Sequence, residues 1–167
     1  MMAAAWVVAA TVASGPALGR GPSITRGFPP LELGMSVEQF SKSVPAEEIA
    51  VAGDDRIFSV TGRRATVTGF LCIFTKGRLS RIEISHSVDY SARVPWQDFL
   101  AGSTREYGTG FRLKTQSGDV AMWDDGRTTL VLERRMVTER ERSYVVTLLD
   151  DAIAIERNER CGPKMFV

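Results

Sequence analysis

The chain has 167 residues, of which 44% are hydrophobic and 25% are charged, a composition typical of a globular protein that folds as one domain. Its 21 Lys and Arg residues nearly balance its 20 Asp and Glu residues, so the formal net charge is only +1. No global electrostatic field therefore draws the chain to nucleic acid or to an anionic membrane, and the sequence argues against both classes of partner.

The first 19 residues carry no charged side chain, are rich in Ala and Val, and end in small residues before Arg20. This pattern is typical of a secretory signal peptide. Its apolar run, residues 1–13, is shorter than the roughly 20 residues that a membrane-spanning helix needs, so we expect no stable membrane span in the mature chain. The alternative is an Ala-rich start without a defined structure. We expect the mature protein to be periplasmic or secreted.

The rest of the chain divides into three parts by composition. Residues 20–27 contain Gly, Pro and Ser and predict a linker. A single α+β domain is expected over residues 28–156. Residues 157–167 show no periodicity and are interpreted as a tail.

The first helix of the domain has a clear start and end in the sequence. Ser36 and Gln39 have the spacing of a capping box, which satisfies the first N–H groups of a helix. Val37, Phe40 and Val44 share one face of this helix, and Pro45 ends it.

The longest apolar and β-branched stretch, residues 66–87, predicts a β-hairpin at the centre of the core, with its turn at Lys76-Gly77. Residues 47–55 show no regular pattern and are interpreted as irregular, before a strand at residues 56–61. A second helix is expected from Pro95 to Gly108, with its apolar stripe at Trp96, Phe99, Leu100 and Tyr107.

Further strands are expected over residues 111–114, 119–123, 127–135 and 143–149, with a two-residue turn at Asp125-Gly126. Element order thus repeats: a helix and three strands precede a helix and three or four strands. The turn segments Phe74 to Arg78 and Trp123 to Arg127 also share a pattern: an aromatic residue, two further residues, Gly and Arg.

This order predicts a diverged duplication with half-repeats over about 28–88 and 93–150, unless two ordinary hairpins are alike by chance. The predicted fold class is α+β: a duplicated unit of a helix plus antiparallel strands that forms one antiparallel sheet with the helices on one face.

One segment also resembles a known family. Leu33-Gly34-Met35-Ser36, followed by Phe40 and Pro45, resembles the helix start of small envelope proteins of the SmpA/OmlA type. Their fold is similar to that of the β-lactamase inhibitor proteins, which are tandem duplications that bind a partner enzyme with the open sheet face. The resemblance covers residues 31–45 as a motif and the remaining chain as element order. It implies helices packed against a small antiparallel sheet.

Signatures of catalysis are absent from the sequence. His86 is the single histidine, and no phosphate loop, dinucleotide fingerprint or zinc-ligand spacing occurs. The acidic pairs at residues 54–55, 124–125 and 150–151 lack the alternating ligands of a calcium loop and are interpreted as turn and cap residues. We expect a non-catalytic protein without cofactor or metal, although carboxylates from separate strands leave acid–base chemistry open.

We therefore expect an exported module that binds another protein of the cell envelope, as an assembly factor or an inhibitor. The outward-facing positions of three strands alternate with core positions and predict the contact surface: Arg81, Glu83, Thr129, Val131, Glu133, Val145 and Thr147. The alternative is a small enzyme or ligand-binding protein. Its pocket would lie between the helices and a curved sheet, be lined by Phe70, Cys72, Phe74, Ile84 and His86, and measure several hundred cubic ångströms.

The chain contains two cysteines, Cys72 in the central hairpin and Cys161 in the tail. In an exported protein an even pair without metal-like spacing predicts a disulfide. The alternative is that Cys72 is a small buried hydrophobic residue and Cys161 a free thiol.

Overall fold

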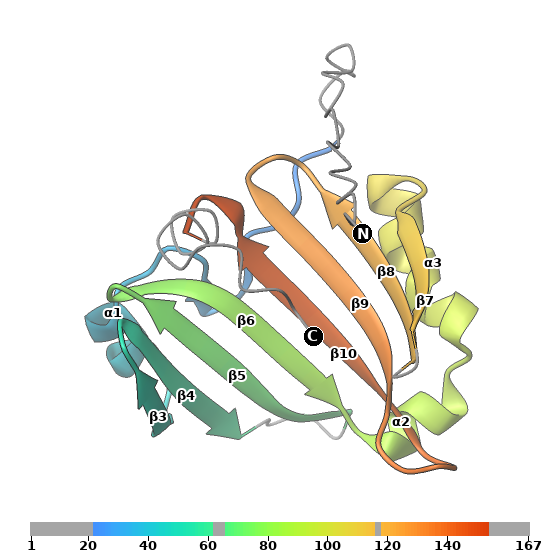
Figure 1. Ribbon diagram of the computed structural model, residues 1–167, viewed down its shortest axis with the longest axis horizontal. Helices are drawn as coiled ribbons and strands as arrows, with labels where there is room; N and C mark the ends of the chain where they lie inside the picture. Colours follow the sequence, from blue (N-terminus) through green and yellow to red (C-terminus); the bar gives the residue numbers. More distant parts are fainter. Residues whose placement is uncertain (1–21, 62–65, 116–117, 154–167) are drawn as a thin grey trace, which may run out of the picture.

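The computed structural model describes residues 22–61, 66–115 and 118–153, and its main feature is an eight-stranded antiparallel sheet (Figure 1). The strand order is β3-β4-β5-β6-β10-β9-β8-β7, and β1 and β2 form a separate antiparallel pair. The α+β class with antiparallel pairing is confirmed. The predicted signal peptide and tail lie outside the described residues.

The strands are β1 (Gly27–Phe28), β2 (Leu31–Glu32), β3 (Glu47–Ala52), β4 (Asp55–Thr61), β5 (Val67–Thr75), β6 (Arg78–His86), β7 (Phe111–Thr115), β8 (Gly118–Asp124), β9 (Thr128–Met136) and β10 (Arg142–Asp150). The helices are α1 (Val37–Ser43), α2 (Val88–Arg93) and α3 (Trp96–Tyr107). Within the described ranges, no helix is both long enough and apolar enough to cross a bilayer.

The sheet divides at its central strand pair, β6 and β10 (Figure 1). In this pair Ile84 lies opposite Val146 and Glu83 opposite Thr147. Strands β3 to β6 extend to one side in chain order, and strands β7 to β10 extend to the other. The two edges of the sheet are therefore β3 and β7.

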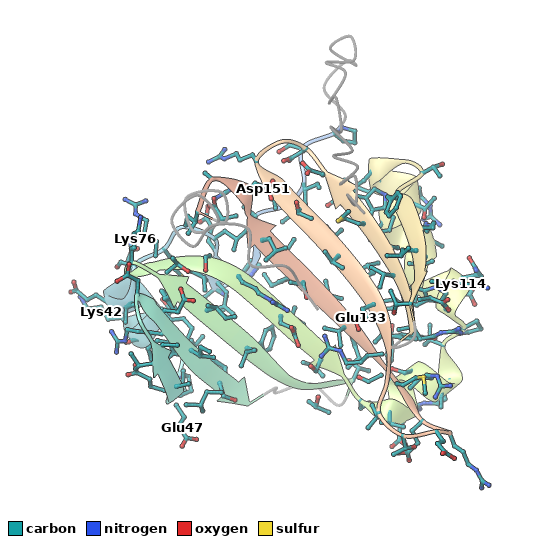
Figure 2. All side chains as sticks on the ribbon, in the orientation of Figure 1. Lys42, Glu47, Lys76, Lys114, Glu133 and Asp151 are labelled. Carbon is teal, nitrogen blue, oxygen red and sulfur yellow. The ribbon has the colours of Figure 1, made fainter. Side chains whose placement is uncertain are left out.

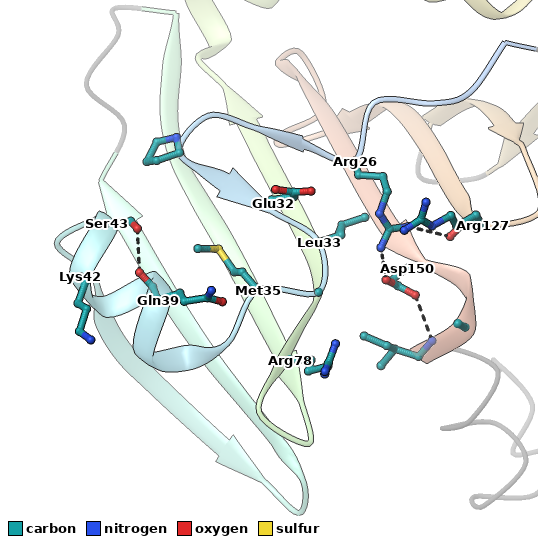
Figure 3. Close-up of a pocket in the computed structure, with 14 residues that line it drawn as sticks. Arg26, Glu32, Leu33, Met35, Gln39, Lys42, Ser43, Arg78, Arg127 and Asp150 are labelled. Atoms are coloured by element: carbon teal, nitrogen blue, oxygen red, sulfur yellow. Dashed lines mark hydrogen bonds and ion pairs between the residues drawn. The ribbon is translucent and has the colours of Figure 1, made fainter.

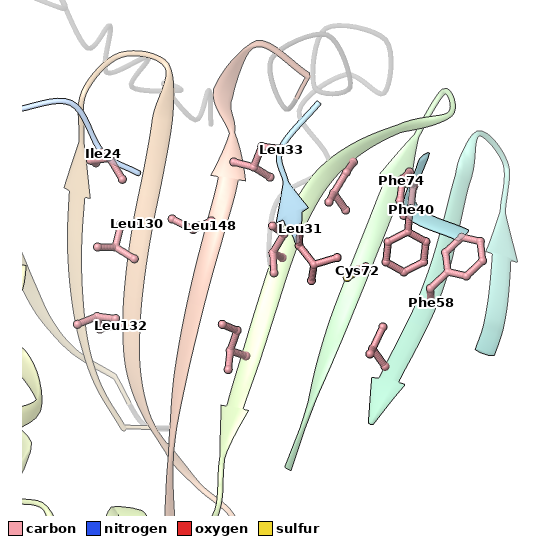
Figure 4. Close-up of a cluster of buried hydrophobic side chains, with 14 of the residues drawn as sticks. Ile24, Leu31, Leu33, Phe40, Phe58, Cys72, Phe74, Leu130, Leu132 and Leu148 are labelled. Atoms are coloured by element: carbon pink, nitrogen blue, oxygen red, sulfur yellow. The ribbon is translucent and has the colours of Figure 1, made fainter. Parts of the chain in front are cut away.

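Helix α1 packs on one half of the sheet through a single aromatic side chain. The predicted capping box is present, since the Ser36 side chain accepts from the N–H of Gln39 and the Gln39 side chain accepts from the N–H of Ser36. The helix buries Phe40 completely between Phe58 of β4 and Phe74 of β5, with ring centroids 5.3 and 5.1 Å away. Figure 4 shows these three rings together at one end of the core.

Helices α2 and α3 pack on the other half around Tyr144 of β10. The ring of Phe99 from α3 lies 4.5 Å from the Tyr144 ring, and Trp96 lies 5.3 Å from it. The Tyr144 hydroxyl donates to the carbonyl of Val94, between α2 and α3, at 2.7 Å. A buried tyrosine that satisfies its hydroxyl in this way holds the helix pair against the strand.

Along the central strands, the structure covers the positions that were expected in the core. The positions expected in the core are buried at Ile82, Ile84, Leu130, Leu132, Tyr144 and Leu148, and half-buried at Val146. Strand β5 also buries Cys72 and Phe74 and half-buries Leu71 and Ile73, as expected for a strand with few exposed positions.

Two elements differ from the sequence-based prediction. Residues 47–52, interpreted as irregular, form edge strand β3. All six are exposed, so neither side of the strand needs apolar residues and the sequence shows no alternation of apolar and polar residues. Residues 88–93 form helix α2, capped by Ser87, immediately before the predicted second helix. This short helix has one buried residue, Ser91, and therefore no apolar stripe in the sequence.

The two predicted turns have different outcomes. Lys76 and Gly77 form the expected two-residue turn, with the positive φ angles of 50° and 77° that such turns favour. In the β8–β9 hairpin the Asp125 N–H bonds to the Thr128 carbonyl, so the turn residues are Gly126 and Arg127, one position later than predicted. The Asp125 carboxylate accepts the N–H groups of Arg127 and Thr128, which holds Asp125 before the turn.

These hairpins also occupy different places in the sheet. Hairpin β5–β6 is the innermost pair of its half, whereas β8–β9 is the middle pair of the other half. The shared pattern of an aromatic residue, two residues, Gly and Arg is therefore not a mark of equivalent hairpins.

The described part of the predicted linker, residues 22–27, contributes to the fold. Ile24 is buried in the core, and its N–H donates to the Asp125 carboxylate at 2.7 Å. Packing therefore begins before Phe28, the predicted start of the domain.

Candidate functional site

The structure brings all seven predicted contact residues onto one face of three adjacent strands. Direct cross-strand partners share a face, and the register pairs Glu83 with Thr147 and Thr147 with Val131. In the same register Val145 pairs with Glu133. Leu149 pairs with Arg81 on one side and with Thr129 on the other. We call this side of the sheet the recognition face; it contains Arg81, Glu83, Thr129, Val131, Glu133, Val145 and Thr147.

Four of these seven residues are less accessible than expected. The exposed fractions are 2% for Val145, 6% for Thr147, and 8% for Glu83 and Thr129. Alternation determines which side of a sheet a residue faces and not whether neighbouring side chains cover it, so these four residues are on the predicted face but are largely covered. Arg81, Val131 and Glu133 remain partly accessible.

A network of ion pairs lies on the recognition face. Arg81 Nη2 contacts Glu83 Oε2 at 2.5 Å, and Arg135 Nη1 contacts Glu83 Oε1 at 3.2 Å. Arg135 also binds Glu133 through two hydrogen bonds, of 2.8 and 3.2 Å. These hydrogen bonds to Glu133 raise the pKa of Arg135. Burial would lower this pKa, but its effect is smaller. Sequence reasoning missed Arg135, although it lies two positions after Glu133 and therefore shares its face.

An apolar patch continues the same face to the β7 edge. Met122 of β8 pairs with Val131 of β9, and Phe111 of β7 pairs with Met122, so the three side chains share one side. Phe111 is 62% exposed and Leu113 is 50% exposed. We call Phe111, Leu113 and Met122 the edge patch. The sequence shows that apolar and polar residues alternate over residues 111–114. It does not show that this strand lies exposed at the edge of the sheet.

Figure 2 shows Glu133 on β9 and Lys114 on β7, which mark the central and edge regions of the sheet. Strand β7 has all five of its residues exposed. Its outer edge pairs with no other strand in the described part of the sheet. Such an edge can accept an additional strand.

An apolar cavity of about 560 Å³ lies on the other side of the sheet. Its floor is one row of register partners across four strands: Val60 of β4, Phe70 of β5, Ile84 of β6 and Val146 of β10. Ile84 follows Glu83 along β6, so the cavity and the recognition face are on opposite sides. The walls come from the β1–β2 hairpin and the end of α1: Phe28, Pro29, Pro30, Leu31, Ser43, Val44 and Pro45.

His86 is the polar aromatic residue in the lining of this cavity. Its Nδ1 lies 3.0 Å from the Thr66 carbonyl, which can only accept, so Nδ1 carries the proton and Nε2 of the neutral ring is an acceptor. The ring stacks on Tyr90 at 4.8 Å and meets the edge of Phe99 at 5.4 Å. Burial lowers the pKa of His86 despite the opposing bond to Thr66, which favours the neutral ring.

Three of the five residues expected to line a pocket do so: Phe70, Ile84 and His86. Cys72 and Phe74 are instead fully buried in the core beside Phe40 and Phe58. The Cys72 thiol is free, so it forms no disulfide in the structure, and Cys161 lies outside the described residues. Desolvation raises the pKa of Cys72 to about 12, so it is a buried hydrophobic residue and not a nucleophile.

A polar cleft of about 970 Å³ lies between α1 and the end of β10 (Figure 3). Arg26, Lys42, Arg78 and Arg127 contribute positive charges to it. Arg26 is paired with Asp150, and Lys42 with Glu38, so these two of the four charges have structural partners. We assign the Arg26–Asp150 pair in this cleft a role in stability.

The carboxylates of Asp124, Asp125 and Asp151 approach within 4.8 Å of one another. Burial raises the pKa of Asp125, but bonds from the N–H groups of Ile24, Thr128 and Arg127 outweigh burial and lower it. Asp125 thus orders the turn, as expected for a turn residue. The hydroxyl of Thr129 donates to Asp151 at 2.7 Å.

Comparison with known proteins gives no match: no family model, curated protein or solved structure matches this chain. The candidate sites are therefore interpreted from their geometry. The resemblance of residues 31–45 to the SmpA/OmlA type remains a hypothesis.

Proposed function

We propose that the chain is an exported, non-catalytic module of the cell envelope that binds another protein through the recognition face and the edge patch. The observation that carries this proposal is the continuity of two kinds of surface on one side of the sheet. Exposed apolar side chains at Phe111, Leu113 and Met122 adjoin the ion-pair network of Glu83, Glu133 and Arg135.

This combination matches the chemistry of protein–protein interfaces. Large apolar side chains supply most of the binding free energy when a partner desolvates them, and surrounding charges select the partner and its orientation. Exposed apolar patches on a sheet edge are otherwise a liability for aggregation, which gives a reason to expect a partner there.

The proposal includes a duplicated helix-plus-strands unit with the helices on one face, which would leave the recognition face for a partner. Support comes from the strand order, which runs outward from β6 and β10 in the same sense on both sides. Further support comes from Phe40 of α1 and Leu100 of α3, which belong to one core cluster with Ile82 and Leu148. A relationship to SmpA/OmlA-type proteins or to the β-lactamase inhibitor proteins is part of the same proposal.

Export is proposed from residues 1–19 alone. Mass spectrometry of the protein from its natural source should show a chain that begins between Ser14 and Gly21. A chain that retains Met1 or Met2 and fractionates with the cytoplasm would contradict export.

The binding surface is tested by photo-crosslinking in the native cells. A crosslinking residue placed at Leu113 or Met122 should form adducts with one protein, and the same residue at Lys42 on α1 should not. Adducts from Lys42 alone would contradict the proposed surface.

Two sets of substitutions then test the role of the surface. With the crosslinking residue placed at Phe111, Leu113→Ser with Met122→Ser should weaken adduct formation at least tenfold, and so should charge reversal at Arg81, Glu83 and Glu133 together. The exposed Glu38–Lys42 pair, exchanged in the same way, is the control. Binding that survives both sets in folded protein, as judged by circular dichroism, would exclude this function.

A further inference from the structure

We propose that the cavity between the β1–β2 hairpin, α1 and the sheet binds a small molecule with an apolar body and one terminal hydroxyl group, which donates a hydrogen bond to Nε2 of His86. This inference is independent of the protein-binding surface, because the cavity and the recognition face lie on opposite sides of the sheet.

The size and lining of the cavity support an apolar ligand. Its volume of about 560 Å³ lies within the range of roughly 300 to 1,000 Å³ that is usual for small-molecule sites. The floor is a row of four apolar side chains, and Phe28, Leu31 and Val44 form the walls. Most of the lining therefore offers only apolar contact.

Several of these side chains are incompletely buried by the protein itself. Phe28, Val44, Val67, Phe70 and Val146 are half-buried at the border of the core, although their neighbours Leu31, Val60 and Ile84 are buried. A ligand that covers half-buried apolar side chains removes their surface from water, which makes the free energy of binding more favourable. The apolar body of the ligand would do so.

The polar group of the ligand follows from the polar groups in the lining. The Ser43 hydroxyl already donates to the Gln39 carbonyl at 2.8 Å. His86 uses Nδ1 for Thr66, and in the neutral ring Nε2 is left as an acceptor. A hydroxyl can donate to this nitrogen, whereas an ionised carboxylate is acceptor-only and cannot. This difference selects an alcohol over a carboxylate at pH 8.

Octan-1-ol and octanoate are suitable probes, because they differ mainly in the terminal group. At pH 8, titration of octan-1-ol into the full ¹⁵N- and ¹³C-labelled chain should give saturable NMR shifts at Val60, Phe70, Ile84 and Val146. Nuclear Overhauser contacts should connect the alkyl chain to the Ile84 and Val146 methyl groups. Octanoate should bind roughly three- to tenfold more weakly, as expected for the loss of one hydrogen bond.

Three substitutions test the site. Val146→Phe on the floor and Val44→Phe on the wall should each reduce octan-1-ol affinity at least tenfold by filling the cavity. Val137→Phe, at an exposed position outside the lining, is the matched control and should leave affinity unchanged. His86→Phe retains an aromatic ring beside Tyr90 and Phe99 but lacks both nitrogens, so it should remove the preference for octan-1-ol over octanoate.

The outcomes that overturn the proposal are defined in the wild-type protein first. Absence of saturation up to the solubility limit, or Overhauser contacts outside the cavity lining, excludes the site. Unchanged affinity in either filling variant that retains its fold excludes it as well. Octanoate binding as tightly as octan-1-ol excludes the hydroxyl-donating class of ligand.

Discussion

Arg26 Nη2 lies 2.5 Å from Asp150 Oδ2, an ion pair that joins the segment before β1 to the end of β10, 124 residues later in the chain. The two side chains are only 17% and 8% exposed. Arg26 also donates to the Thr128 hydroxyl at 3.0 Å, and Asp150 accepts the N–H of Ile153 at 3.3 Å. Both charges are therefore enclosed by hydrogen-bonding partners, as a buried pair requires.

Removing one partner of this pair should destabilise the fold. Arg26→Ala leaves the buried Asp150 carboxylate without its counter-ion, and we expect the free energy of unfolding to fall by about 3 kcal/mol. Urea unfolding followed by circular dichroism measures the change. Lys42→Ala, which breaks the exposed pair with Glu38, should cost less than about 0.5 kcal/mol. Equal effects of the two substitutions would contradict a structural role for Arg26.

Phe40 is expected to contribute more to stability than any other residue of α1. It is fully buried and its ring contacts both Phe58 and Phe74. Phe40→Ala should lower the free energy of unfolding by about 3 to 5 kcal/mol, because it leaves a cavity in a packed cluster. Ile49→Ala on the exposed edge strand β3 is the control and should change it by less than about 0.5 kcal/mol.

The Cys72 thiol should be inert in the folded protein. Burial raises its pKa to about 12, so almost no thiolate is present at pH 8. In a Cys161→Ser variant, Ellman's reagent should detect no thiol before unfolding and one thiol after it. Rapid reaction of the folded variant would contradict the burial of Cys72.

The same reagent decides the disulfide question in the wild-type chain. Unfolded, non-reduced protein should release two thiols if Cys72 is free, as it is in the structure. Release of none, restored to two by reduction, would mean that the exported protein is oxidised between Cys72 and Cys161.

Protonation of His86 should destabilise the fold at mildly acidic pH. Its folded-state pKa is lowered by burial, so the unfolded state binds a proton first as the pH falls below about 6.5. The neutral ring therefore contributes its full stabilisation above about pH 6.5. This contribution decreases as the pH falls from there to the lower folded-state pKa. Urea unfolding between pH 7 and 5 should show this fall, and His86→Phe should remove it. An unchanged slope in the variant would assign the fall to other groups.

Asp151→Asn should stabilise the protein at pH 7. Burial, together with the charges of Asp124, Asp125 and Asp150, raises the pKa of Asp151, which means that its ionised form is disfavoured in the fold. Asparagine retains an acceptor for the Thr129 hydroxyl and removes the repulsion. Thermal unfolding should show a higher Tm at pH 7 and no difference near pH 3, where Asp151, whose pKa is raised, is protonated. Asp89→Asn in the first turn of α2 should instead lower stability by about 0.5 kcal/mol.

The features that the sequence alone determined depend on near neighbours in the chain. The capping box at Ser36 and Gln39 and the turn at Lys76 and Gly77 follow from local hydrogen bonds and backbone angles. In β6, β9 and β10, the side of the sheet on which each residue lies follows from the alternation of side chains along a strand. For this reason the seven contact residues could be assigned to one face before the structure was known.

Tertiary structure alone decided which of those residues a partner could reach and where a cavity lies. Burial of Val145 and exposure of Phe111 depend on neighbours that the chain brings from other segments, so no local pattern records them. The same holds for β3, whose exposed residues have no burial period, and for Ile24, which reaches the core through packing against later strands. The cavity combines Phe28, Val44, Ile84 and Val146 from four separate elements, and only the packed chain places them together.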